Sequence, residues 1–390
     1  LLHNHGMRPG PMTAPLLAAA VLFYGLVGCA STRALPSGDA STVDALFRDY
    51  DGPDLPGASV VVIHDGQVVL RRAYGLAELE QRTPATPESN YRLASLSKQF
   101  TATAILLLVQ DGRLRLDDRV VDVLPGFPPS LREVRVHHLL QHTSGIWDYE
   151  DFVPPTQTVQ VKDRDVLTLL SRTDKTWFAP GTAVRYSNSG YAVLALIVEQ
   201  VGGMPFARFL HERVFVPSGM RSTVAHEEGV SSVPRRAYGY AAGPTGFIPR
   251  DQSPTSAVLG DGGIYASVVD LVAWDQALES QALLLPEARR QAWTPPTLPD
   301  GTRSRYGFGW FVDEDGGRQR LSHHGETCGF TNAIVKYPEQ RLTVIVLTNR
   351  AGGAPWTLAQ RVADLWLGGP AKEGPASARA WPFETLPNAH

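Results

Sequence analysis

Hydrophobic residues near the start of the chain change from a helical to a strand-like spacing. After a polar stretch at residues 30–41, apolar and aromatic residues recur at positions 43, 46, 47 and 50, the i, i+3, i+4, i+7 spacing of one helix face. The next apolar segment, ASVVVIHDGQVVLRRAYG, is interrupted at Asp65-Gly66, a dipeptide that favours a tight turn between antiparallel strands. The pattern therefore predicts a helix followed by a β-hairpin.

The middle of the chain alternates helical patterns with long loops. The apolar run TATAILLLV ends at Asp111-Gly112, where glycine suits a helix C-terminus. Roughly residues 125–290 contain further helical patterns, in HHLLQH, GYAVLALIVEQVGG and VVDLVAWDQAL. The second of these has start signals at Asn188 or Ser189 and a stop at Gly202-Gly203. We expect this part of the chain to be mostly helical.

From residue 305 the pattern becomes strand-like again. The segments YGFGWFVDE, RQRLSHHGE, GFTNAIVKYP and RLTVIVLTN predict four strands, with turns at residues 315–317 and 338–339. A last helix is expected at about residues 354–366. Strands at both chain ends predict an α/β fold of the α+β type. One antiparallel sheet would combine the N-terminal hairpin with the C-terminal strands, with helices flanking it and the mostly helical region inserted between its halves.

The first residues have the pattern of an export signal. Arg8 precedes an apolar stretch at residues 16–27, which suits a signal-peptide core and is too short to span a membrane. The stretch ends in LVGCAS, similar to a bacterial lipobox in which Cys29 would be lipidated; the alternative is an ordinary signal peptide with an incidental cysteine. We expect a lipid-anchored protein on the periplasmic side of the bacterial envelope. Its expected parts are a signal peptide (1–28), a tether (29–41), one domain (42–368) and a disordered tail (369–390).

Composition narrows the class of protein only slightly. The 390 residues are 43% hydrophobic and 19% charged, as in an ordinary globular protein. A net charge of -3, without a basic cluster, gives no indication of nucleic-acid binding. There are two cysteines, so lipidation of Cys29 would leave Cys328 without a partner, and we expect no intrachain disulfide.

The stretch RLASLSKQF, which opens the central helix, carries the first candidate chemistry. It places Ser95 and Lys98 three residues apart, on one face of a helix, so that the lysine amine can reach the serine hydroxyl. A helix N-terminus and burial both lower a lysine pKa, and a neutral lysine can take the serine proton. S-x-x-K alone is a weak signal, and the alternative is the polar first turn of a buried helix.

Two later motifs supply possible partners for this pair. In YSN, residues 186–188, a tyrosine near the lysine can relay protons and an asparagine amide can orient the lysine and a substrate carbonyl. In HHG, residues 323–325, a glycine on an edge strand would let a substrate backbone approach closely. The backbone N–H groups of Ser95 and Glu326 would then offer two donors to an oxyanion.

The motifs SLSK, YSN and HHG, in this order, resemble the penicillin-recognising serine hydrolases. That family includes class C β-lactamases, DD-peptidases, D-aminopeptidases and esterases, and uses S-x-x-K, Y-x-N, and K-T-G or H-x-G. The stretches LLQHTSGI and YGFGW also look like the family, and the resemblance covers about residues 43–367. It implies a serine hydrolase that works through an acyl-enzyme and requires no metal or cofactor. It also implies the roles of nucleophile for Ser95, shared acid–base catalysis for Lys98 and Tyr186, and substrate binding for Asn188, His323, Gly325 and Glu326.

The third motif departs from the pattern of penicillin-destroying members, which usually have lysine at its first position. His323 is mostly neutral at pH 7 and would hold an antibiotic carboxylate weakly. This favours D-amino-acid peptides, amides or small esters over β-lactams as substrates. Glu326 either favours an amine-bearing substrate or points to solvent. A true class C-type β-lactamase and a non-catalytic envelope binding protein remain the alternatives.

Two other kinds of site need a pattern that the sequence does not supply in full. His138 and His142 are four residues apart in a predicted helix and could share a metal, but no third ligand or H-E-x-x-H pattern accompanies them, so we expect no metal site. The segment His-Thr-Ser-Gly is better explained as a structural turn. A Ser-His-Asp hydrolase would need G-x-S-x-G, which is absent from the sequence.

Overall fold

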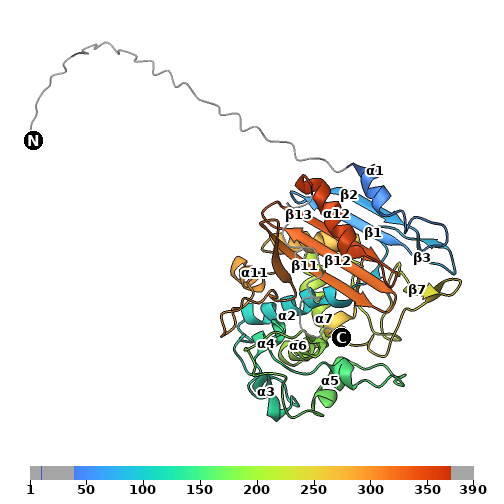
Figure 1. Cartoon of the computed structure of the whole chain (residues 1–390). Coiled ribbons are helices and arrows are strands. Elements are labelled where there is room, and N and C mark those ends of the chain that lie inside the picture. Colours follow the sequence, from blue (N-terminus) through green and yellow to red (C-terminus); the bar gives the residue numbers. More distant parts are fainter. Residues whose placement is uncertain (1–9, 11–38, 370–390) are drawn as a thin grey trace, which may run out of the picture. The chain divides into compact units, whose positions relative to one another are not determined.

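The computed structural model describes residue 10 and residues 39–369 (Figure 1). The predicted signal peptide, Cys29, the tether up to residue 38 and the tail from residue 370 lie outside the described residues. The first helix, α1 (Ala40–Leu46), begins inside the predicted tether. It begins there because the side chain of Asp39 caps it, accepting a hydrogen bond from the N–H of Ser41.

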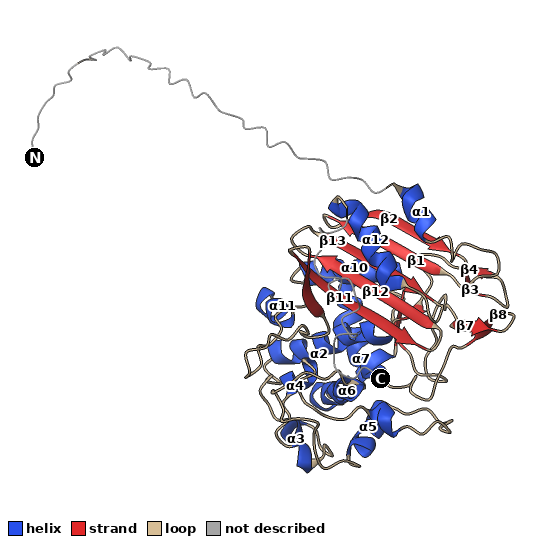
Figure 2. Ribbon diagram, in the orientation of Figure 1, coloured by secondary structure: helices blue, strands red, loops and turns tan. Residues whose placement is uncertain are grey.

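The framework is one six-stranded antiparallel sheet with the order β10-β11-β12-β13-β1-β2 (Figure 2). Strand β1 pairs with β2 on one side and with β13 on the other, so strands from the two ends of the chain meet in one sheet, as the sequence predicts. Asp65 and Gly66 both have positive φ, the conformation that the tight β1–β2 turn requires. The strands are β1 (Ala58–His64), β2 (Gln67–Tyr74), β10 (Phe311–Asp315), β11 (Arg318–Thr327), β12 (Phe330–Tyr337) and β13 (Leu342–Thr348).

Helices cover both faces of this sheet, and alternate residues of each strand pack against them. In β1, Val60 and Val62 face a cluster that includes α1 and α12 (Pro355–Leu367). Val61 and Ile63 of the same strand face a second cluster, which includes α2 (Lys98–Gln110) and α10 (Val268–Glu279). The strands β1, β12 and β13 are therefore buried on both sides, which explains why apolar residues predominate in them and do not simply alternate with exposed polar ones.

The region between the sheet halves is mainly helical, as predicted. Helix α6 is its centre, because it is apolar all round and packs against α2, α4, α5 and α9. Gly203, in the left-handed conformation, ends α6 at the predicted stop. The helices of this region are α3 (Val120–Val123), α4 (Val136–Leu140), α5 (Asp163–Leu170), α6 (Asn188–Gly202), α7 (Phe206–Leu210), α8 (Val216–Ser218), α9 (Leu259–Gly262) and α11 (Pro286–Ala292).

Short strands, which the hydrophobic pattern did not predict, also occur around this region. They are too short to show an alternation of apolar and polar residues. They form a three-stranded sheet, β5-β9-β6, and two small hairpins. Their bounds are β3 (Leu76–Glu78), β4 (Thr83–Pro84), β5 (Tyr91–Arg92), β6 (Val224–Ala225), β7 (Tyr240–Gly243), β8 (Gly246–Pro249) and β9 (Ile264–Ala266).

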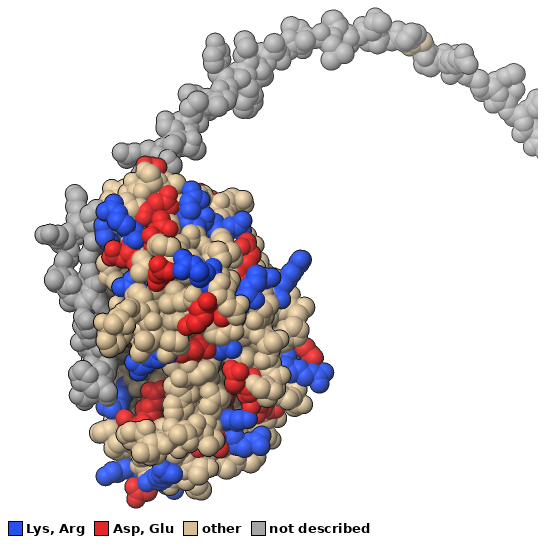
Figure 3. Space-filling model, turned by 90° about the vertical axis from the view of Figure 1, so that its right-hand side faces the viewer, with Lys and Arg blue, Asp and Glu red and all other residues tan. Residues whose placement is uncertain are grey.

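Within residues 39–369, no single helix is long and apolar enough to cross a membrane; α6 passes such a test only together with the segment Phe206–Ser218, at a bend of 78°. On the face shown in Figure 3, basic and acidic side chains are interspersed.

Candidate active site

Ser95 and Lys98 lie at the junction of a short 3-10 helix and α2. The 3-10 turn η1 (Ala94–Ser97) contains Ser95, and α2 begins at Lys98. Residues i and i+3 are eclipsed in a 3-10 helix, and the Nζ of Lys98 lies 3.1 Å from the Oγ of Ser95. Ala94, just before the serine, has a φ of 51°, a strained value of the kind found at active sites. The predicted contact between serine and lysine is therefore present, although the local helix is tighter than expected.

The Nζ of Lys98 has two further neighbours, and both accept hydrogen bonds. These are the Oδ1 of Asn188 at 2.8 Å and the backbone carbonyl of Asp261 at 3.0 Å. The lysine is fully buried, and this burial lowers its pKa to about 8. When the amine is neutral, its two N–H bonds satisfy the two carbonyl oxygens. Its lone pair then faces the hydroxyl of Ser95, as a general base requires.

Tyr186 borders the same lysine from the loop that leads into α6. The Nζ of Lys98 is 4.9 Å from the centre of the tyrosine ring. Burial raises the pKa of Tyr186 well above its usual value, and a hydrogen bond with Ser95 opposes this shift only in part. The phenol therefore keeps its proton at neutral pH and can donate it. Asn188 follows as the first residue of α6, which fixes its amide beside the lysine.

The end of strand β11 forms the opposite wall. The pairing of β10 with β11 stops at Ser322, so residues 323–327 have an open edge on that side. A Cβ on Gly325 would lie 2.2 Å from the carbonyl oxygen of Leu93. Glycine is thus needed there because β11 packs directly against the turn that carries the nucleophile, and not only for the approach of a substrate.

His323 is placed behind this edge, not on it. Its ring is fully buried, with Nε2 2.9 Å from the hydroxyl of Tyr306 and Nδ1 2.7 Å from the carbonyl of His324. Burial and the nearby Lys98 lower the pKa of His323 to about 3, so the ring is neutral. Substrate contact by His323 remains a prediction, as does the oxyanion pair formed by the N–H groups of Ser95 and Glu326.

A small pocket of about 50 Å³ opens beside Ser95. Of the residues predicted from the motifs, Ser95, Asn188 and Glu326 line it, whereas Tyr186 lines a neighbouring cavity of about 340 Å³. The remaining lining residues of the small pocket are Arg92, Ala94, Tyr149, Glu150, Thr255, Asp261, Gly262 and Thr327. Three acidic groups and one basic group, that of Arg92, line the pocket, and sequence analysis identified only Glu326 among them.

Glu150 and Asp261 are the acidic residues that sequence analysis missed. Asp261 is buried, and this burial raises its pKa to about 7. The side chain of Glu150 is exposed, and partial desolvation together with neighbouring carboxylates raises its pKa above the usual value. The Oδ2 of Asp261 accepts a hydrogen bond from the hydroxyl of Tyr149 at 2.9 Å. Their stretches, DYED and LGDGG, contain no spacing that connects them to Ser95, so only the fold could identify them.

Asp148 and Asp163 hold the backbone of two elements of this site in place. The carboxyl of Asp148 accepts a hydrogen bond from the N–H of Asn188 at 2.6 Å. That of Asp163 accepts from the N–H groups of Leu259 and Gly260, at the start of α9. Asp163 thereby fixes the start of α9. This helix contains Asp261, whose backbone carbonyl accepts the hydrogen bond from Lys98.

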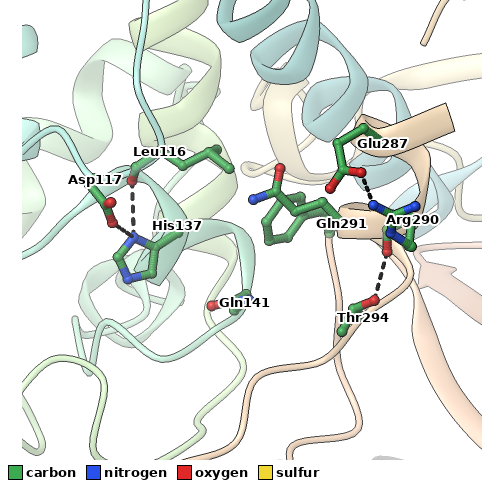
Figure 4. Close-up of a pocket in the computed structure, with 9 residues that line it drawn as sticks. Leu116, Asp117, His137, Gln141, Glu287, Arg290, Gln291 and Thr294 are labelled. Carbon is green, nitrogen blue, oxygen red and sulfur yellow. Dashed lines mark hydrogen bonds and ion pairs between the residues drawn. The ribbon is translucent and has the colours of Figure 1, made fainter. Parts of the chain in front are cut away.

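A larger cavity, of about 630 Å³, lies between α4 and α11 and has a different character (Figure 4). None of the predicted site residues lines it. Its polar groups pair with one another: His137 with Asp117 and the carbonyl of Leu116, and Arg290 with Glu287. Its size therefore does not make it the reactive site.

The two histidines considered as a metal pair bind different partners. The Nδ1 of His138 accepts from the N–H of Arg135, and that of His142 accepts from the N–H of Ser187. Within the part of the chain that the structure describes, no group of three or more His, Cys, Asp or Glu residues is arranged to hold a metal ion.

Known proteins are similar in sequence to this chain. The family model described as Beta-lactamase matches residues 43–365. Penicillin-binding protein 4* of Bacillus subtilis is 32% identical over 323 residues, covering 79% of this chain and 71% of that protein. D-aminopeptidase of Brucella canis is 31% identical over 329 residues, which are 82% of this chain. The match spans only 61% of the Brucella enzyme, less than two thirds of its length.

Solved structures share the fold. The octameric penicillin-binding protein homologue from Pyrococcus abyssi superimposes with a TM-score of 0.74 at 28% identity, covering 85% of this chain and 77% of that one. D-amino acid amidase from Ochrobactrum anthropi superimposes with a TM-score of 0.70 at 23% identity, covering 83% and 95%. The family model spans nearly all the described residues, and Ser95, Lys98 and Asn188 are in direct contact. The chain therefore belongs to the β-lactamase family and is a serine hydrolase of that family.

Proposed function

We propose that the protein hydrolyses the amide bond of small D-amino-acid amides or peptides with an unblocked amino group, through an acyl-enzyme on Ser95. The observation that carries the proposal is the pocket itself, where Ser95 lies beside the carboxyl groups of Glu150, Asp261 and Glu326. The name of the Brucella relative, a D-aminopeptidase, supports the same substrate class.

Acylation begins when the neutral amine of Lys98 takes the proton of Ser95. The serine Oγ then attacks the substrate carbonyl carbon, and the carbonyl π electrons move to the oxygen, where the N–H groups of Ser95 and Glu326 would stabilise the negative charge. Asn188 keeps Lys98 oriented through the bond of 2.8 Å to its Nζ.

Collapse of the tetrahedral intermediate breaks the carbon–nitrogen bond. The phenol of Tyr186 donates its proton to the leaving nitrogen and regains one from the Lys98 ammonium. The amine departs and an ester on Ser95 remains. Water then attacks this ester, giving up a proton to the same pair, and the acid product leaves Ser95 with its hydroxyl restored.

An ammonium group on the substrate suits the acidic pocket. Partial desolvation and neighbouring carboxylates raise the pKa of Glu150, whose side chain is exposed at the pocket. A substrate ammonium would lower that pKa and ionise the carboxyl, forming a charge-assisted hydrogen bond. A β-lactam carboxylate has no such partner at His323, whose ring is buried and neutral. We therefore expect weak β-lactamase activity at most.

Labelling by a fluorophosphonate probe tests the nucleophile. We expect one label per protein molecule and none on Ser95→Ala, because only an activated serine displaces the fluoride of the probe and forms a phosphonate ester. Equal labelling of that variant would refute the assignment. A panel of D-amino-acid amides, D-Ala-D-Ala peptides, short esters and a chromogenic cephalosporin then tests the substrate class. Labelling without hydrolysis of any of these would instead support a non-catalytic binding protein.

Substitution of Glu150 tests recognition of the amine. We expect Glu150→Gln to raise KM for D-alaninamide about tenfold, because a charge-assisted hydrogen bond is lost. Hydrolysis of p-nitrophenyl acetate, which lacks an ammonium group, should change little. Asp151→Asn, at the exposed neighbouring position, is the matched control. An unchanged KM for the amide would exclude Glu150 as the amine partner.

We also propose that the mature protein is held at the envelope by lipid on Cys29. The support is the sequence LVGCAS after the apolar stretch at residues 16–27. Cys29→Ser should move the protein from the membrane fraction to the soluble periplasmic fraction, and mass spectrometry should detect a diacylglyceryl cysteine in the wild-type protein. Retention of the variant in the membrane fraction would contradict the proposal.

A further inference from the structure

One residue, His142, contacts the chain on both sides of Tyr186. The backbone carbonyl of His142, just beyond α4, accepts a hydrogen bond from the N–H of Arg185 at 2.9 Å. Its ring Nδ1 accepts one from the N–H of Ser187 at 3.2 Å. Because these N–H groups belong to the residues before and after Tyr186, His142 fixes the backbone from which the tyrosine extends.

The same histidine packs against the tyrosine ring. The centres of the His142 and Tyr186 rings are 4.1 Å apart, with an angle of 36° between their planes. The ring of His142 also lies 4.4 Å from that of Tyr306, whose hydroxyl contacts His323. Only 2% of His142 is exposed. The tyrosine is thus restrained through both its backbone and its ring.

The chemical state of His142 suits this restraint. Burial, together with the positive charge of Lys98, lowers its pKa well below the usual value, so the ring is neutral. Since Nδ1 accepts a hydrogen bond, the ring proton is on Nε2. His142 also has a φ of 56°, a conformation that costs free energy for most side chains but is more common for histidine, asparagine and aspartate.

We propose that His142 is a positioning residue for Tyr186, which it holds in the orientation that delivers a proton to the leaving group. The inference rests on the proposed role of Tyr186. Asp148 and Trp147 hold the following residues, through the N–H of Asn188 and the hydroxyl of Ser187. His142 therefore acts on the part of the loop that carries the phenol, and the HTSG segment is more than a structural turn.

This role predicts a dependence on the leaving group. An amine leaves an amide only with an added proton, whereas p-nitrophenolate leaves an ester without one. A misplaced Tyr186 should therefore slow amide hydrolysis more than ester hydrolysis. A purely structural defect would lower both in proportion to the fraction of intact protein.

Two substitutions test the aromatic ring of His142 and its hydrogen-bond acceptor separately. His142→Phe keeps an aromatic ring but removes the acceptor for the N–H of Ser187. His142→Asn loses the ring but keeps an acceptor near the Nδ1 position and tolerates positive φ. His137→Phe, on the preceding helix α4 and outside the site, is the matched control. The full-length proteins are compared, with active molecules counted by fluorophosphonate labelling.

We expect His142→Phe to lower kcat for D-alaninamide about tenfold or more per labelled molecule, with KM nearly unchanged. Hydrolysis of p-nitrophenyl acetate should fall less, and His142→Asn should recover most of the amide activity. Equal losses with both substrates, or no recovery by asparagine, would overturn the proposal. Should the wild-type enzyme hydrolyse no D-amino-acid amide, the substrate assignment fails on its own. The best amide in the panel then replaces D-alaninamide in the same comparison, and a wild-type enzyme that cleaves esters but no amide would overturn the role of His142 as well.

Discussion

Lys98, at the nucleophile, and Lys336, on the inner face of strand β12, are both buried but have opposite surroundings. The Nζ of Lys336 lies 2.9 Å from the Oδ1 of Asp275 and 2.6 Å from the Oε1 of Glu279, both on α10. The Nζ of Lys98 contacts a hydroxyl, a side-chain amide and a backbone carbonyl, all neutral. Among the described residues, no carboxylate lies within ion-pair distance of Lys98.

From this difference we infer a structural role for Lys336 and a catalytic role for Lys98. The ion pairs of Lys336 with two carboxylates join α10 to the sheet. Around Lys98, the more distant carboxylates of Asp261, Asp148 and Glu150 favour the charged form, but burial outweighs them and lowers the pKa. A buried lysine can thus act as a base when its direct hydrogen-bond partners are neutral and the nearest carboxylates lie beyond ion-pair distance.

The largest expected effect is that of Lys98→Met on catalysis. Loss of the base should slow fluorophosphonate labelling and amide hydrolysis by about 10³-fold. The midpoint of thermal unfolding should stay the same or rise, because no ion pair is broken and a buried amine is replaced by an apolar group. A large fall in stability would show that Lys98 is also a structural residue.

Lys336→Met should have the opposite outcome. Removing one partner of a buried ion pair should lower the free energy of unfolding by about 3–5 kcal/mol, measured by urea denaturation. Activity per labelled molecule should be retained at temperatures where the variant is folded. The double variant Lys336→Met, Asp275→Leu should recover part of the loss, because no unpaired charge is then left at Asp275. A stable but inactive single variant would contradict the comparison.

The smallest effect is that of pH, and it concerns Lys98 alone. With the pKa of Lys98 at about 8, its reactive neutral form increases about tenfold per pH unit below that value and then levels off. Between pH 8 and 10.5, the unfolded lysine still holds a proton that the folded one has lost, so this group makes stability rise with pH. Lys98→Met should lose this contribution to the pH dependence of stability, and an acylation rate independent of pH from 6 to 8 would contradict the assignment.

Much of the framework was predictable because its signals are local. Alternation and turn residues such as Asp65-Gly66 predicted the strands, and Gly203 ended α6 where expected. The contact between Lys98 and Asn188 joins residues 90 positions apart, and only the order of the motifs indicated it. The short strands β6 and β9 escaped prediction because two or three residues show no period.

The acidic side of the site could not be predicted, for a different reason. Glu150 and Asp261 become neighbours of Ser95 only through η3 (Tyr149–Phe152) and α9, which tertiary contacts position. The need for glycine at position 325 also has a cause that the sequence did not indicate, since a Cβ there would meet the carbonyl of Leu93, and the approach of a substrate remains a prediction. A site that is assembled by contacts between distant parts of the chain has no characteristic residue spacing in the sequence.

The pairing of β1 with β13 also affects the order of events during synthesis. Its partner β13 ends at Thr348, so the sheet cannot close until nearly the whole chain has been made. The nucleophile and the helical region are then produced long before their support exists, and such non-local pairing makes folding slow. In a chain with this topology, the pairing of β1 with β13 therefore forms only late in synthesis.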